Sequence, residues 1–289
     1  MEFGIDISVY QKKIDLTQAL AEGVTFAIIK AGGADCGKYK DSYFEYHYQN
    51  CAAHSIPVGS YFFGKCNTVE QAIEEAKYYL SIIKDKIFPL KCWYDIEASM
   101  CSLPKERLNA IAKAFCATVS EAGYECGVYA SLSTFNKIDY DGSFSSTYPK
   151  WIAYWGKSKP NAVREGKDIW QFGGESNMIR SNKVGRVTCD CDYCYFTFEK
   201  TAPALNKPMV ALYTLRYGNR GEAVRELQED LNYLFKSGLV LDGSFGSKTK
   251  KALIEAQKVF FPEESKEWDG VYGPKTYNKM IERMKAHED

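Results

Sequence analysis

The stretch that decides the fold of this chain is Lys91-Cys92-Trp93-Tyr94-Asp95-Ile96-Glu97-Ala98. Its aromatic and β-branched residues predict a short buried strand, with helical patterns before it at residues 68–84 and after it from Pro104. Because strand side chains alternate, Asp95 and Glu97 should point the same way. Buried carboxylates cost stability unless they are paired, hydrogen-bonded or neutralised. The pair therefore favours a catalytic site, with ion pairs to lysines at a strand edge as the structural alternative.

Strands and helices alternate along the first half of the chain. Short apolar runs predict further strands at residues 3–8, 26–30, 58–63 and 128–131, each followed by a helical pattern. Beyond residue 131 the helices fade, and strands are expected at 151–155, 169–172 and 192–198. About five strand–helix units followed by three bare strands predict an α/β fold, an irregular parallel (β/α) barrel.

Barrel enzymes build their sites at the carboxyl ends of the strands. Polar or aromatic residues lie at or near these ends here, namely Asp6, Lys30, Tyr61, Asp95, Glu97, Tyr129, Trp151, Tyr154, Gln171 and Asp192. The sequence shows no cysteine–histidine pair or glycine-rich phosphate loop beside them. Four acids among aromatic rings indicate glycoside hydrolysis rather than phosphoryl or acyl transfer.

Composition argues against other classes of function. The 37 basic and 37 acidic residues cancel, which disfavours nucleic acid as a partner. No run approaches the roughly 18 apolar residues that span a bilayer, so we expect no stable membrane insertion. Residues 1–6 enter a strand without a basic and apolar leader, which predicts synthesis in the cytoplasm without a signal peptide. Aromatic residues, at 15%, suit sugar stacking or an aromatic core.

All ten cysteines lie between residues 36 and 194, in a region large enough not to need disulfides, and we interpret most as reduced buried thiols. Cys189, Cys191 and Cys194 could form a zinc site. Their spacing lacks a second matching pair, and the three histidines are distant in sequence. We therefore expect neither a metal nor a cofactor.

Six segments resemble, in this order, signature segments of glycoside hydrolase family 25 lysozymes. They are Gly4-Ile5-Asp6-Ile7-Ser8-Val9-Tyr10-Gln11, Ile28-Ile29-Lys30-Ala31, Tyr94-Asp95-Ile96-Glu97, Gly127-Val128-Tyr129, Trp151-Ile152-Ala153 and Ile169-Trp170-Gln171. The resemblance covers about residues 1–200. It implies an irregular β/α barrel that cleaves the β-1,4 bond after N-acetylmuramic acid in peptidoglycan, with retention of configuration.

The resemblance also implies residue roles. Glu97 would be the general acid that protonates the leaving oxygen, which requires a raised pKa. Asp95 would orient the substrate's own acetamido group, so that the substrate provides the nucleophile. Asp6 and Asp192 match the first-strand and last-strand aspartates and would tune the pair or position water. The expected substrate-binding residues are Tyr61, Tyr129, Trp151, Trp170, Gln171 and Lys30.

Two segments depart from the family pattern. The third strand reads Tyr61-Phe62-Phe63 where Tyr-His-Phe is usual, which removes an imidazole. The last strand normally resembles Val-Asp-Leu-Asn, whereas Cys191-Asp192-Tyr193-Cys194 puts a cysteine where asparagine is usual. We align Asp192 rather than Asp190 with the family's aspartate, because the following Tyr195-Phe196 keeps the aromatic end of the motif.

A second domain is expected after a linker at residues 201–209. Within residues 210–289, the stretch at 242–249 recurs at 269–276, each time as an Asp-Gly turn, an aromatic residue, a glycine and a helix start. With another helix from Ala223, this predicts a small all-α three-helix domain. It resembles the peptidoglycan-binding domain 1 type of cell-wall module; a bundle serving dimerisation or stability is the alternative.

Together these features predict a peptidoglycan hydrolase with a catalytic barrel at residues 1–200 and a wall-binding domain. The arrangement resembles a phage endolysin, which acts on the cell wall once the membrane is breached and lyses the host; a bacterial autolysin is the other source. The alternatives are a non-catalytic wall-binding protein, an oligomerising scaffold or a chitinase-like enzyme, which would show aspartate at position 93 where this chain has Trp93. Target species and oligomeric state are not determined by the sequence.

Overall fold

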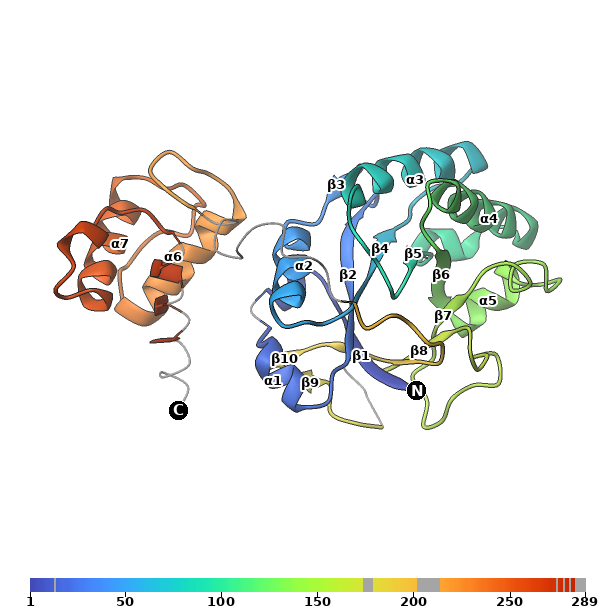
Figure 1. Ribbon diagram of the computed structural model, residues 1–289. Helices are drawn as coiled ribbons and strands as arrows, with labels where there is room; N and C mark the ends of the chain where they lie inside the picture. Colours follow the sequence, from blue (N-terminus) through green and yellow to red (C-terminus); the bar gives the residue numbers. More distant parts are fainter. Residues whose placement is uncertain are drawn as a thin grey trace. The chain divides into compact units, whose positions relative to one another are not determined.

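The computed structural model describes residues 1–12, 14–173, 179–201, 214–273, 275–277, 279–280 and 282–283. The chain divides into two compact units, Met1–Leu205 and Asn206–Asp289 (Figure 1). Each unit has its own hydrophobic core. The predicted linker at 201–209 lies outside the described residues except for Thr201.

The first unit is a closed barrel of eight strands, which confirms the predicted barrel. The strands are β1 (Glu2–Ile7), β2 (Phe26–Gly33), β4 (Val58–Phe63), β5 (Cys92–Asp95), β6 (Cys126–Ser131), β7 (Lys150–Ala153), β8 (Ile169–Gly173) and β11 (Asp190–Cys194). Their order around the sheet is β1-β11-β8-β7-β6-β5-β4-β2, and the pairing of β1 with β2 closes it.

One strand departs from the predicted parallel arrangement. β11 runs antiparallel to both of its neighbours, β1 and β8. It also begins at Asp190 and ends at Cys194, two and four residues earlier than expected. An antiparallel partner needs no crossover helix, which accounts for the step from β8 to β11, whereas the parallel strands β7 and β8 are joined by residues 154–168 without a helix. Three short strands were not predicted: β3 (Tyr39–Lys40) beside β2, and a hairpin of β9 (Lys183–Val184) and β10 (Val187–Thr188).

Helices pack on the outside of the barrel (Figure 1). They are α1 (Leu16–Ala21), α2 (Phe44–Ala53), α3 (Val69–Ile83), α4 (Lys105–Glu121) and α5 (Leu132–Ile138), with short 3-10 turns η1 (Val9–Gln11) and η2 (Ala98–Ser102). The predicted start of α3 is present, since Thr68 Oγ1 accepts the backbone N–H of Gln71 at 3.3 Å. Among the described residues, none of the helices has the length and apolarity to cross a membrane.

Strand alternation separates two apolar layers. Side chains such as Ile5, Tyr94 and Phe172 pack outward against the helices, and Tyr94 stacks on Phe115 of α4 with ring centroids 3.8 Å apart. Side chains of the opposite parity, including Trp93 and Trp151, fill the barrel interior.

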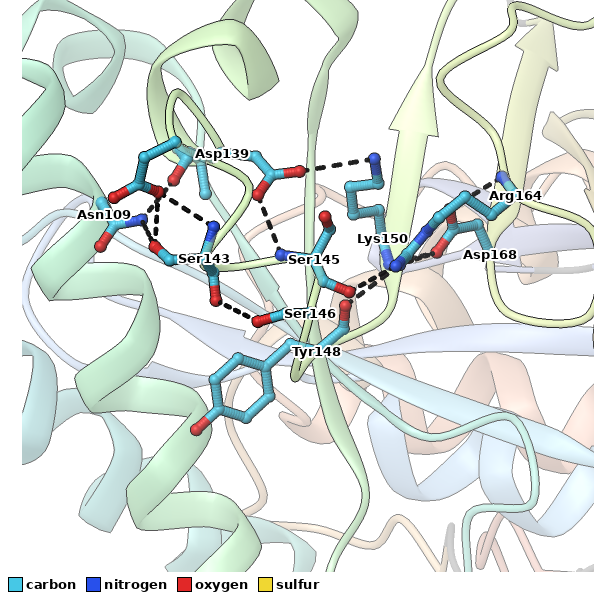
Figure 2. A network of polar contacts seen from close by, with 11 residues as sticks. Asn109, Asp139, Ser143, Ser145, Ser146, Tyr148, Lys150, Arg164 and Asp168 are labelled. Carbon is cyan, nitrogen blue, oxygen red and sulfur yellow. Dashed lines mark hydrogen bonds and ion pairs between the residues drawn. The ribbon is translucent and has the colours of Figure 1, made fainter.

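A buried ion pair joins the loops around β7 (Figure 2). Asp168 is fully buried and accepts hydrogen bonds from Arg164 Nε at 2.8 Å, Arg164 Nη2 at 2.7 Å and the backbone N–H of Lys150 at 2.9 Å. Arg164 also donates to the backbone carbonyls of Ser145 and Tyr148. The pair therefore connects the segment before β7 to the segment before β8.

The second unit contains α6 (Glu222–Phe235), α7 (Ser247–Phe260), the 3-10 turn η4 (Ser265–Glu267) and helical residues at 275–277, 279–280 and 282–283. The sequence repeat has a structural counterpart in two buried glutamines. Gln228 donates through Nε2 to Asp242, Thr249 and the carbonyl of Ser244. Gln257 makes the equivalent bonds to Asp269, Thr276 and the carbonyl of Val271. Each glutamine ties an Asp-Gly turn to the following helix.

Candidate active site

A cavity of about 170 Å³ lies at the carboxyl end of the barrel strands. It is lined by Asp6, Lys30, Tyr61, Phe63, Asp95, Glu97, Tyr129, Trp151, Gln171 and Asp190. Eight of the ten residues expected to be catalytic or substrate-binding are thus brought together. Phe63 and Asp190 join them, whereas Asp192 and Trp170 are not part of the lining.

Asp95 and Glu97 project from one end of β5. Asp95 is the last residue of the strand and Glu97 follows in an extended conformation (φ −139°, ψ −170°), so the alternation continues past the strand. Asp95 is 5% exposed, and burial, then the neighbouring charge of Glu97, raises its pKa well above the ordinary value. Burial also raises the pKa of Glu97, opposed by a hydrogen bond with Tyr129 and by the charge of Lys30. Both carboxyls are therefore biased toward the protonated form.

Gln171 connects Asp6 to the aromatic residues Tyr129 and Trp155 on one side of the cavity. Its Nε2 donates to Asp6 Oδ2 at 2.9 Å, and its Oε1 accepts from Tyr129 Oη at 2.9 Å. The Trp155 indole Nε1 donates to the same Oε1 at 3.2 Å. The glutamine amide orientation is determined by these three partners, because its oxygen faces donors and its nitrogen faces a carboxylate.

The floor of the cavity is aromatic. Trp151 is 1% exposed, with ring centroids 4.5 Å from Tyr129, 5.9 Å from Tyr61 and 5.9 Å from Trp93. Rings locked against one another in this way form a rigid apolar surface. A sugar ring could pack on this surface while its polar groups meet the acids.

Lys30 supplies positive charge to the cavity. Its Nζ lies 5.0 Å from the ring centroid of Phe63 and 5.9 Å from that of Tyr61. Its charge lowers the pKa of both Asp95 and Glu97, although burial dominates at each. Lys30 is therefore close enough to limit how far the pKa of either acid rises.

Asp192, the last-strand aspartate expected at the cavity, does not line it. Asp190, not Asp192, lines the cavity, and it pairs in register with Asp6 across β1 and β11. Asp192 lies beneath the cavity, fully buried. With Asp190 in the place of the family's aspartate, the asparagine position of the Val-Asp-Leu-Asn pattern falls on Asp192 rather than on Cys194. The aromatic end of the motif was a weaker guide than the strand register.

Two further side chains, those of Trp170 and Phe62, point away from the cavity. Trp170 was expected in a sugar subsite, but it faces outward, packs against Phe172 and Tyr193, and donates to the carbonyl of Tyr154 at 2.8 Å. Phe62 also faces outward, into the helix layer. The missing imidazole at position 62 therefore does not alter the cavity.

Trp155 was not among the site residues expected from the sequence. This residue follows β7, is 49% exposed and is held to the cavity by its bond to Gln171. A tryptophan at the carboxyl end of a predicted barrel strand was a usable signal in the sequence.

Eight of the ten cysteines are buried and serve as packing residues. All ten are free, and Cys189, Cys191 and Cys194 are buried with their thiols directed at backbone carbonyls. Burial raises the pKa of each of these three thiols. Within the described part of the chain, no group of three or more potential ligands is arranged to hold a metal ion.

The sequence matches models of two known protein families. The model of "Glycosyl hydrolases family 25" covers residues 5–179, which is more than half of the chain. The chain belongs to glycosyl hydrolases family 25. It is therefore a glycoside hydrolase, and the resemblance of its six motifs is confirmed. A second model, "Putative peptidoglycan binding domain", matches residues 220–280 of this family 25 enzyme.

Similar proteins carry related names. The autolytic lysozyme of Clostridium acetobutylicum is 25% identical over 256 residues, covering 89% of this chain and 72% of that protein. Lysozyme M1 of Streptomyces globisporus is 27% identical over 200 residues, 65% of each protein. The chain thus spans about two thirds of these relatives.

Solved structures share the fold. The spore cortex lytic enzyme SleM of Clostridium perfringens superimposes with a TM-score of 0.57 at 21% identity, over 66% of each chain. The CTP1L endolysin gives 0.54 at 20% identity, over 82% of this chain and 80% of that one. At these identities the likeness establishes the shared fold of the family 25 enzymes.

Proposed function

We propose that this family 25 enzyme hydrolyses bacterial peptidoglycan at the β-1,4 bond between N-acetylmuramic acid and N-acetylglucosamine. The observation that carries the proposal is the Asp95–Glu97 pair, two partly or fully buried carboxyls with raised pKa values at the end of one barrel strand. A glycosidase needs one protonated carboxyl for the leaving oxygen and a second to assist at the sugar.

Glu97 is the better general acid of the two. It is the more exposed member of the pair and its raised pKa keeps a proton available. Proton transfer requires contact with the glycosidic oxygen, which a half-buried carboxyl at the cavity mouth can make. Protonating that oxygen removes the need to expel an alkoxide.

Asp95 suits a role toward the substrate's acetamido group. Its Oδ1 is buried and accepts no hydrogen bond from the described residues. A buried acceptor without a donor is costly unless a ligand satisfies it. The amide N–H of an N-acetyl group would do so, and the bond would orient the acetamido oxygen toward the anomeric carbon.

The cavity is small compared with the roughly 300–1,000 Å³ of typical ligand pockets. A glycan strand must therefore extend over the rim. Trp155 and Tyr154 offer exposed rings there, at 49% and 41% exposure. Trp155 is held in place by Gln171, so it can stack against a neighbouring sugar with little loss of side-chain entropy.

The second unit would hold the enzyme on the wall. Its match to a peptidoglycan binding family supports this role, as does its separate core. Tethering to an insoluble polymer raises the local substrate concentration without new contacts at the active site. We further propose that the enzyme is a phage endolysin that reaches the wall when the host membrane is breached.

The test is the chemistry of the new reducing end. Purified enzyme is incubated with Gram-positive cell walls, the products are reduced with borohydride, and the sugar alcohol is identified by mass spectrometry. We expect reduced muramic acid. Reduced glucosamine would show that the other glycosidic bond is cleaved, and no release from walls of several species would contradict the proposal.

Deleting the second unit should weaken binding to cell walls without weakening hydrolysis of soluble glycan. A chain ending at residue 200 keeps both barrel cores. We expect its wall-bound fraction in a pelleting assay to fall by about 10²-fold or more, because avidity is lost. Its hydrolysis of soluble glycan fragments should change little; equal loss of both activities would show that the second unit belongs to the catalytic fold.

A further inference from the structure

The side chain of Asp192 lies below the cavity and is not explained by the roles given above. It is fully buried within the barrel on β11. One oxygen, Oδ1, accepts the Trp151 indole N–H at 2.7 Å. The other, Oδ2, has no hydrogen-bond donor among the described residues. An ionised carboxylate with one donor in an apolar interior is strongly destabilising.

The groups around Asp192 make ionisation harder still. Its strand neighbours in register are Gly4 on β1 and Gln171 on β8, and β7 contributes the neutral Trp151 indole. Asp6 from β1 and Asp190 from β11 itself place negative charge beside it. The adjacent thiols of Cys191 and Cys194 are buried, and burial raises the pKa of each. Its surroundings therefore favour a neutral side chain.

A proton on Oδ2 would neutralise the buried charge and give this oxygen a hydrogen-bonding role. It would turn the oxygen without a partner into a donor, and Asp6 is within hydrogen-bonding reach of Asp192. That hydrogen bond lowers the pKa of Asp6 and raises the pKa of Asp192, although burial raises both. Asp192 is also the more deeply buried of the two, fully buried against 9% exposure for Asp6, so it is the carboxyl that keeps the proton.

We propose that Asp192 is a proton-bearing positioning residue, a neutral carboxylic acid that accepts from Trp151 and donates from Oδ2 to Asp6. In this state it connects the aromatic floor of the cavity to the first-strand acid. Gln171 holds Asp6 from the other side through its 2.9 Å bond. Asp6 is then held between two donors, with its charge kept in one place relative to Asp95 and Glu97.

Asparagine and leucine at position 192 distinguish a neutral acid from a charged one. Asp192→Asn keeps an oxygen for Trp151 and supplies an N–H for Asp6, so kcat on soluble peptidoglycan fragments should stay within about 3-fold of wild type. Asp192→Leu leaves the indole N–H and Asp6 without their partner. We expect its kcat to fall about 10- to 100-fold, with a smaller change in KM.

The matched control is Glu75→Gln on α3. Glu75 is also a buried carboxyl with a raised pKa, and it accepts from Tyr94 Oη at 2.6 Å on the outer side of the barrel. Its replacement should leave kcat within about 3-fold. If Asp192→Asn loses as much activity as Asp192→Leu, the charge is required and the proposal is overturned. Full activity in Asp192→Leu would overturn it as well.

Two readouts do not depend on activity. The infrared C=O stretch of a protonated carboxylic acid should be present in wild type at neutral pH and reduced in Asp192→Asn. The unfolded chain releases this proton near pH 3.9, whereas the folded protein keeps it, so wild-type unfolding free energy should fall as pH rises above about 4. Asp192→Asn should lose that component, and its stability relative to wild type should grow with pH. A constant difference, with no change in the infrared band, would show that Asp192 is ionised.

The activity readout rests on the proposed function, but the infrared and stability readouts do not. A wild-type protein that hydrolyses no glycan would contradict the proposed function alone. The state of Asp192 would still be decided by the other two measurements, which also apply if Asp192→Leu does not fold.

Discussion

Replacing Glu97 by glutamine should lower kcat for peptidoglycan hydrolysis by about 10²- to 10⁴-fold, the range that a general acid contributes. Glutamine keeps the size and hydrogen-bonding capacity of the side chain but cannot transfer a proton to the leaving oxygen. Turbidity loss of cell walls and release of reducing sugar both measure the effect. Binding to walls in a pelleting assay should be unchanged, because the proposed binding surface lies on the other unit.

The control for this loss is again Glu75→Gln, a glutamate-to-glutamine change outside the cavity. Residual activity of Glu97→Gln within a few-fold of wild type would assign the acid to another carboxyl, with Asp190 the next candidate in the lining. The pH dependence gives a second check. Only protonated Glu97 can donate, so wild-type activity should fall as pH rises through its raised pKa.

Replacing Asp168 by asparagine should reduce the free energy of unfolding of the barrel by about 3 kcal/mol. Asp168 is fully buried and takes four hydrogen bonds, three of them from Arg164 and one from the Lys150 backbone (Figure 2). Without the carboxylate, the Arg164 charge loses its compensation. This loss is at the lower end of the usual range for breaking a buried ion pair, because the Arg164 side chain is 26% exposed.

Urea unfolding followed by tryptophan fluorescence measures this change in the full chain. Four of the five tryptophans, at positions 93, 151, 155 and 170, belong to the barrel. The matched control is Glu165→Gln, which removes the exposed Lys159–Glu165 pair in the same loop. It should change stability by less than about 0.5 kcal/mol, since exposed ion pairs contribute little. Equal effects of the two variants would show that the buried ion pair contributes no more to the free energy of unfolding than the exposed one.

The barrel was predictable because its signal is local. Most barrel strands are indicated by apolar and β-branched residues over four to eight positions, and the longer helices by a 3.6-residue period. β5 illustrates this, since Asp95 and Glu97 could be placed on one face from two-residue alternation alone. The strands of two residues, β3, β9 and β10, are too short to carry such a pattern.

The register of β11 was not predictable from local pattern. Asp190 and Asp192 lie two residues apart, so alternation assigns them to the same face and cannot say which is nearer the rim. The pairing of Asp190 with Asp6 decides it, and that pairing joins residues at opposite ends of the barrel sequence. In the second unit, the repeat was visible, but the roles of Gln228 and Gln257 depend on turns and helices that meet only after folding.

By itself, the sequence determined the barrel, the separate second domain, the family and the acids at the end of β5, because these follow from short-range periodicity and contiguous motifs. Tertiary structure alone decided the antiparallel course of β11, the outward direction of Trp170, the place of Trp155 at the rim and the burial of Asp192 under the cavity. These features depend on which strands pair and in which register. Such contacts join residues far apart in the chain, so a local sequence pattern cannot predict them.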